Sequence, residues 1–190
     1  LVKTYAENAQ VSDSASTATA IHSGVKTHIG GVGVYARQQI DACAPGAPLP
    51  QSILQQAEDR GMATGIVSTA RLTHATPAST YAHVPDRGWE ADGAVPEAAR
   101  EAGCRDIARQ LIEFDHGDGV DVALGGGRGA FLPSDAGGQR RDGRLLPAEW
   151  SARAQGGVYV SDAAGFAALD PADDTPVLGL LSNSHMSYDH

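Results

Sequence analysis

A serine at the predicted start of a helix is the side chain in this sequence best placed to do chemistry. Ser14 follows Asp13 and opens a run of small and β-branched residues that ends at Gly24. The first backbone amides of a helix have no intrahelical partner and the helix dipole is positive there, so phosphate binds well at such a position. An Asp-Ser pair alone is most often only a helix cap, so the surrounding pattern must decide between the two interpretations.

Other motifs give weaker signals. The glycines at 30–33 and 125–129 lack the GxGxxG spacing between a strand and a helix that dinucleotide binding requires. Residues 115–118 (DHGD) lack the remaining ligands of a calcium loop, which favours a solvated turn. Three histidines have no metal-ligand spacing and are expected to be structural, namely His22, His28 and His83.

Helical and strand patterns alternate along the chain, and together they must position any site. Helices are predicted at 14–23, 52–60, 98–114, 148–154 and 162–169. Strands are predicted at 62–69, 120–124, 158–160 and 177–181. This alternation predicts an α/β fold with a mostly parallel central sheet and helices on both faces, in which ligand sites gather at the carboxyl ends of the strands.

Two segments stand outside this alternation. Residues 71–89 are rich in His, Thr, Pro and Gly and are predicted to form a long loop after a strand, where functional residues are common. Residues 134–142 are the most polar and glycine-rich stretch, and we expect a surface excursion there.

Composition limits the class of protein. The 190 residues suffice for one domain, and no apolar run approaches the roughly 18 residues that a membrane span needs. A net charge of −9 with 14 scattered Lys and Arg residues argues against nucleic acid as a partner. Spacing alone does not decide whether Cys43 and Cys104 form a disulfide or are two buried thiols.

The pattern around Ser14 resembles a known family. Residues 11–27 (VSDSASTATAIHSGVKT) are similar to the nucleophile motif of alkaline phosphatases, in which Asp-Ser-Ala is followed by a Thr/Ala-rich helix and Gly-Val-Lys. The resemblance continues in register along the chain. It covers residues 61–69, 70–77 (ARLTHATP), 81–84 (YAHV), 87–89 (RGW), 121–127 (DVALGGG) and 178–181 (LGLL).

This resemblance implies hydrolysis of phosphate monoesters with zinc and magnesium as cofactors. Ser14 would be the nucleophile, held by Zn²⁺, which depresses the pKa of its hydroxyl and replaces a general base. Arg87 would grip two phosphate oxygens with its planar fork, and Asp13 would orient that guanidinium.

The same resemblance assigns the residues around the second metal. Thr76 corresponds to a hydroxyl ligand of the Mg²⁺ site. His74 stands at a position that varies between aspartate and histidine, and we expect it to act through a metal-bound water or in a zinc-loaded site. Trp89 would form a wall behind the ligands.

Resemblance to the animal-type and related bacterial members also implies a Cys43–Cys104 disulfide, which fits a periplasmic or secreted protein. The full-length enzyme is expected to be a homodimer. The family grips the phosphoryl group rather than the leaving group, so the physiological substrate stays open.

Most zinc ligands of the family lie in segments that correspond to regions before Leu1 and after His190. We therefore expect residues 1–190 to be one segment of an incomplete alkaline phosphatase domain, inactive when alone. If turnover were found, His185, Asp189 and His190 would be the first residues to reconsider as ligands. The alternatives are a phosphodiesterase or sulfatase relative, which would use a different nucleophile setting, and a non-catalytic phosphate- or metal-binding relative.

Overall fold

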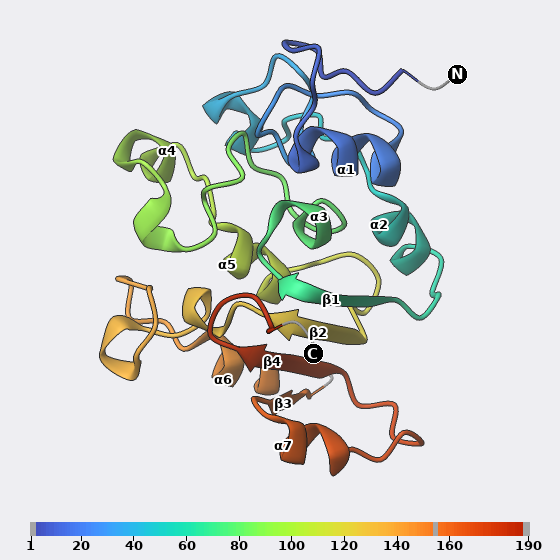
Figure 1. The fold of residues 1–190 in the computed structure, drawn as a ribbon, viewed down its shortest axis with the longest axis vertical. Helices are drawn as coiled ribbons and strands as arrows, with labels where there is room; N and C mark the ends of the chain where they lie inside the picture. The colour runs from blue at the N-terminus through green and yellow to red at the C-terminus, as the bar shows by residue number, and fades with distance from the viewer. Residues whose placement is uncertain (1–2, 154–155, 188–190) are drawn as a thin grey trace.

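Four parallel strands form the centre of the structure, a computed structural model that describes residues 3–153 and 156–187. The strands are β1 (Gly65–Arg71), β2 (Val122–Gly126), β3 (Val158–Val160) and β4 (Val177–Ser182). They lie in the order β1-β2-β4-β3, and every neighbouring pair is parallel. The arrowheads of β1, β2 and β4 point the same way in Figure 1, so their carboxyl ends share one edge of the sheet. The predicted parallel α/β fold is confirmed.

Short helices flank this sheet. They are α1 (Ser14–Ser23), α2 (Ile53–Glu58), α3 (Ala75–Ala78), α4 (Glu97–Glu101), α5 (Ile107–Ile112), α6 (Leu146–Ser151) and α7 (Ala163–Ala167). Helix α1 packs on α3, and α3 packs on β1, so the predicted serine-bearing helix is linked to the sheet through α3 (Figure 1). The last residue of the predicted 148–154 helix lies outside the described residues.

Side-chain caps explain where several helices begin. Asp13, Ser52 and Asp106 each accept a hydrogen bond from a backbone amide in the first turn of α1, α2 and α5. Ser52 and Gln55 form a reciprocal capping box, so α2 begins one residue after the predicted start. Such caps satisfy amides that would otherwise lack partners.

The predicted helix 98–114 is wrong as one element, because it divides into α4 and α5. Gly103 has a φ of 91°, a left-handed conformation that ends α4, and Cys104 is bonded to Cys43. Asp106 then caps the new helix by accepting from the amide of Arg109 at 2.9 Å. The disulfide and the glycine together redirect the chain between the two helices.

Two loop predictions also need correction. The predicted loop 71–89 contains the single turn α3, in which Pro77 sits in the first turn, where the amide that proline lacks would have no helical partner. The predicted surface excursion 134–142 contains the fully buried side chain of Arg140. Its guanidinium pairs with Asp106 at 2.9 Å and with Asp142, so burial of the charge is compensated.

The core lies between the sheet and the helices. Leu178 and Leu180 on β4, Ile107 and Leu111 on α5, and Trp150 on α6 are fully buried. Gly179 on β4 leaves room for a side chain of the neighbouring strand. A Cβ there would lie 2.6 Å from Leu124 Cδ2 on β2, so the leucine side chain would have to shift.

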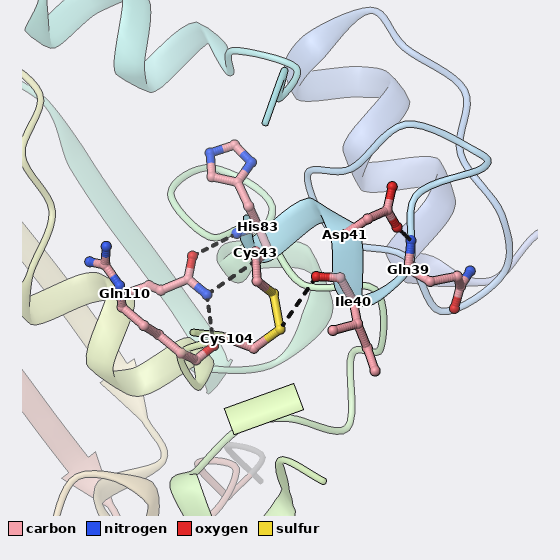
Figure 2. The surroundings of a disulfide bond; sticks show 8 residues. Gln39, Ile40, Asp41, Cys43, His83, Cys104 and Gln110 are labelled. Atoms are coloured by element: carbon pink, nitrogen blue, oxygen red, sulfur yellow. Dashed lines mark hydrogen bonds between the residues drawn. A yellow bond between two sulfur atoms is a disulfide. The ribbon is translucent and has the colours of Figure 1, made fainter. Parts of the chain in front are cut away.

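The predicted Cys43–Cys104 disulfide is present, with 4.9 Å between the two Cα atoms. Figure 2 shows it beside the 3₁₀ turn Ile40–Cys43, where Gln110 also contacts His83. Gln110 accepts from the His83 amide at 2.8 Å and donates to the Arg105 carbonyl at 3.0 Å. The disulfide joins the segment after α1 to the α4–α5 region, and Gln110 joins that region to the loop that carries His83. Within residues 3–153 and 156–187, no helix is long and apolar enough to cross a membrane.

Candidate active site

Helix α1 presents its N-terminus to the candidate site. Asp13 is the N-cap, and its Oδ1 accepts from the Ser16 amide at 3.0 Å and from the Ser16 hydroxyl at 2.8 Å. The amides of Ser14 and Ala15 donate to no residue that the structure describes. Because these amides point outward at the positive end of α1, they are available to an anion.

Arg87 joins the residues that the sequence singled out. Its Nη1 donates to Ser14 Oγ at 2.7 Å and to Asp13 Oδ2 at 3.1 Å. Its Nη2 donates to His74 Nε2 at 2.9 Å. Asp13, Ser14, His74 and Arg87 therefore form one cluster, although they come from three separate segments. We call these four residues the serine cluster.

Backbone contacts hold Arg87 in place. Its amide donates to the Gly30 carbonyl at 2.8 Å, and Val32 pairs with Val84 in an antiparallel bridge. The His28 ring lies 2.9 Å from the Pro85 carbonyl through Nε2 and 3.1 Å from the Ala36 carbonyl through Nδ1. The segment after α1 thus fixes the backbone on which Arg87 is carried.

The environment keeps Asp13 ionised. Partial burial opposes its charge, but the hydrogen bonds from Ser16 and Arg87 outweigh burial and lower the pKa of Asp13 to about 2. Asp13 is thus an anion at neutral pH, paired with the guanidinium that also contacts Ser14.

His74 is a neutral acceptor. Burial, together with the positive charges of Arg87 and Arg71, lowers the pKa of its imidazole. Since Nε2 accepts from Arg87, the ring proton lies on Nδ1. This neutral form is the one that can also serve as a metal ligand.

The remaining predicted site residues are not joined to the serine cluster. Thr76 lies on α3 with an exposed side chain, and its hydroxyl makes no hydrogen bond to a described residue. Trp89 is only 6% exposed and belongs to the hydrophobic core, and its carbonyl accepts from the Ile107 amide at 2.8 Å.

Three further side chains lie next to the serine cluster, and the sequence pointed only to His185 among them, as an alternative metal ligand. Arg71 ends β1, Glu90 follows Arg87 by three residues, and His185 follows β4. Arg71 and Glu90 form a two-fold hydrogen-bonded ion pair at 2.8 and 2.6 Å. Arg71 and His185 lie at or just after the carboxyl ends of β1 and β4, where the sites of parallel sheets gather, and this position was the signal available from sequence.

The other histidines have local partners. His22 Nδ1 lies 2.7 Å from Ser79 Oγ and so ties α1 to the end of α3. His83 contacts the Gly33 carbonyl through Nδ1 and Gln55 through Nε2. In the 115–118 turn, His116 lies 2.9 Å from Asp59.

The described residues fit only part of a metal centre. Within residues 3–153 and 156–187, no three His, Cys, Asp or Glu side chains come together as a metal site. Ser14 and Thr76 offer hydroxyl oxygens and His74 offers an imidazole nitrogen, and these are suitable metal ligands. Ser14 Oγ and His74 Nε2 each already accept a hydrogen bond from Arg87. Asp189 and His190 lie outside the described residues.

Fold and cluster together define an α/β protein with a candidate anion site at a helix N-terminus, next to an arginine. The family model described as alkaline phosphatase matches residues 1–190. The chain therefore belongs to the alkaline phosphatase family, as its sequence motifs indicated.

Individual relatives agree with this assignment. The alkaline phosphatase of Gadus morhua is 42% identical, over 100% of this chain and 42% of that protein. The tissue-nonspecific isozyme of Homo sapiens is 38% identical, over 100% of this chain and 38% of that protein. The chain thus spans about two fifths of the length of these relatives.

Solved structures share the fold. The crystal structure of Thermus thermophilus alkaline phosphatase is 31% identical with a TM-score of 0.71, and the match covers 99% of this chain and 32% of that chain. Alkaline phosphatase from the Antarctic bacterium TAB5 is 29% identical with a TM-score of 0.70, over 98% of this chain and 44% of that chain. A mutant of the TAB5 enzyme is described with Mg bound in its M3 site.

Proposed function

We propose that this chain carries the nucleophile of a phosphomonoester hydrolase that works through a covalent phosphoserine at Ser14. The observation that carries the proposal is the 2.7 Å contact between Arg87 Nη1 and Ser14 Oγ at the N-terminus of α1. A hydroxyl, a guanidinium and free helix amides at one point are the groups that an in-line attack on phosphorus needs. Membership of the alkaline phosphatase family supports the same reaction.

The first step forms one bond and breaks another. Ser14 Oγ loses its proton to solvent and attacks phosphorus, the Oγ–P bond forms, the ester P–O bond breaks, and the leaving oxygen takes up a proton from water and departs as the alcohol. Arg87 donates to two non-bridging oxygens of the phosphoryl group, which its planar fork can reach together. The amides of Ser14 and Ala15 lie at the positive helix end, where they favour the negative charge of that group.

The second step returns the serine. Water attacks the phosphoserine from the side opposite Oγ, inorganic phosphate leaves, and Ser14 recovers its proton. Asp13 stays ionised and paired with Arg87, so the guanidinium keeps its orientation through both steps. His74 accepts from the other arm of Arg87 and limits its rotation.

Metal ions are part of this proposal. When bound, zinc and magnesium supply Lewis-acid charge that favours the deprotonated Ser14 hydroxyl and offsets the charge on the phosphoryl oxygens. Ser14 on the zinc side, and Thr76 with His74 on the magnesium side, are the residues of this chain that would hold them. The remaining ligands would come from the parts of the full-length enzyme that this chain does not include.

The disulfide supports a location outside the reducing cytosol. We propose a periplasmic or secreted enzyme, because disulfides such as Cys43–Cys104 persist in oxidising compartments. The full-length enzyme is proposed to act as a homodimer on phosphate monoesters.

Phosphate release from a chromogenic monoester by the full-length enzyme tests the function. Metal-dependent release in the parent and its loss in Ser14→Ala are expected. Ser12→Ala is the matched control, because Ser12 lies just before Asp13 and its hydroxyl contacts Ser16 rather than Arg87. Undiminished activity in Ser14→Ala would contradict the proposal.

A further inference from the structure

The group formed by Arg71, Glu90 and His185 adjoins the serine cluster without contacting Ser14. Arg71 Nε and Nη2 donate to the two carboxylate oxygens of Glu90, and the Thr73 hydroxyl donates to Glu90 as well. Burial opposes the charge of Glu90, but these hydrogen bonds outweigh it and lower its pKa. Glu90 is therefore a fixed anion, and it holds the guanidinium plane of Arg71 in one orientation.

The third nitrogen of Arg71 is directed to His185. Arg71 Nη1 lies 2.7 Å from His185 Nε2, and the Arg71 amide lies 3.2 Å from His185 Nδ1. Arginine carries donors only, so Arg71 is the donor and His185 Nε2 the acceptor in the shorter contact. The loop is fixed on both sides of this ring: Ser182 Oγ donates to the His185 carbonyl at 3.0 Å, and the Met186 amide donates to Thr69 on β1 at 2.8 Å.

His185 in turn packs against His74. The two rings meet edge to face, with centroids 5.1 Å apart and planes at 73°. Rings in this arrangement attract each other, and the contact restricts rotation of both. The His74 Nε2 that accepts from Arg87 is therefore held by a ring that is itself held by Arg71.

These contacts form one continuous series: Glu90, Arg71, His185, His74, Arg87 and Ser14. We infer that His185, anchored by Arg71 and Glu90, is a positioning residue that sets the orientation of Arg87 through His74. The inference rests on the proposed function, because it assigns a role in gripping phosphate. It explains why an exposed histidine after β4 is fixed by hydrogen bonds on both sides.

The test uses the full-length, metal-loaded enzyme and inorganic phosphate. His185→Ala is expected to weaken the calorimetric Kd for phosphate and to raise KM by about 2- to 30-fold, the range for coupling through packed side chains. The melting temperature should stay within a few degrees, since His185 is exposed. His116→Ala is the matched control, because His116 contacts Asp59 away from the cluster, and its phosphate affinity should equal that of the parent.

A double-mutant cycle distinguishes a coupled effect of Arg71 and His185 on phosphate binding from two independent effects. Arg71→Gln should also weaken phosphate binding, and the double variant with His185→Ala should be no weaker than the more affected single variant. Additive losses of phosphate affinity would show that Arg71 and His185 act independently, which would overturn the inference. An unchanged Kd in His185→Ala, or a changed Kd accompanied by loss of bound zinc or magnesium, would overturn the positioning role.

Failure of this inference is distinguishable from failure of the proposed function. If Ser14 becomes phosphorylated while His185→Ala binds phosphate like the parent, only the role of His185 is wrong. If Ser14→Ala keeps full activity, the proposed function itself is wrong.

Discussion

Arg87 and Ser14 are 73 residues apart in the chain, yet Arg87 Nη1 lies 2.7 Å from Ser14 Oγ. The same guanidinium donates to Asp13 through Nη1 and to His74 through Nη2. One planar side chain thus links the helix N-terminus to the loop after β1. The proposed phosphate grip depends on that planarity.

Replacing Arg87 by Lys should weaken phosphate binding by about 1–3 kcal/mol, since a point charge cannot donate to two oxygens at once. The inhibition constant of inorganic phosphate on the full-length enzyme measures this loss. Arg128→Lys provides a control, because Arg128 donates to the Ser161 carbonyl on another part of the chain. Equal inhibition of the Arg87→Lys variant and the parent would remove Arg87 from the phosphate site.

Asp13 should contribute a pH-dependent part of the stability. Its folded pKa of about 2 lies below the ordinary value of 3.8, so the ionised form stabilises the folded state above about pH 4, and the contribution disappears as pH falls toward 2. The size is about 2 kcal/mol at neutral pH. Asp13→Asn keeps a capping oxygen but loses the charge.

Denaturant unfolding of the full-length parent and Asp13→Asn measures that contribution. The difference in free energy of unfolding should be constant from pH 7 to about pH 5 and should shrink below pH 4. A difference that stays the same at every pH would show that the charge of Asp13 does not stabilise the fold.

The disulfide should be formed in exported protein and should stabilise it. It closes a 61-residue separation, which contributes about 4 kcal/mol on the chain-entropy account. Non-reducing peptide mass mapping should find the Cys43–Cys104 linkage, and reduction should lower the melting temperature. Two freely alkylated thiols in native exported protein would refute the pairing.

The parts of the fold that follow local patterns could be predicted from sequence. Helix α1 has its cap, its small-residue run and its terminal glycine within twelve residues, so its predicted bounds agree with those observed, Ser14–Ser23. The strands are short runs rich in apolar and β-branched residues and bounded by turn residues, although most of β1 is not buried. The division of the 98–114 helix depends on the left-handed Gly103 and the Cys43 linkage, and a 3.6-residue periodicity contains neither.

The site could be predicted only as far as its motifs extend. Asp13 and Ser14 are adjacent in sequence, and the family motif supplied Arg87 and His74. The Arg71–Glu90–His185 group combines the last residue of β1, a residue of the loop after α3 and a residue just after β4, and only the folded chain brings these together. Burial of Arg140 was missed for the same reason, because its partner Asp106 lies 34 residues away.

Residues 1–190 produced alone should show little or no phosphatase activity. The described residues contain no complete metal centre, and a neutral serine hydroxyl without a base or metal is a weak nucleophile. Apolar side chains such as Ile21, 78% exposed, and Val67, 76% exposed, should also lower solubility. Zinc and magnesium titration at alkaline pH, beside the full-length enzyme, measures the activity. Substantial turnover by the short chain would show that it holds the metal ligands itself, and His185 would then be examined first.

Mapping the covalent intermediate identifies the residue that attacks phosphorus. The full-length enzyme is mixed with a phosphate-labelled monoester, quenched in acid during turnover and digested, and the labelled peptide is sequenced by mass spectrometry. Three serines compete within the same segment, Ser12, Ser14 and Ser16, and only Ser14 contacts Arg87. The label is expected on Ser14 and should be absent in Ser14→Ala. Label on Ser12, Ser16 or another residue would contradict it.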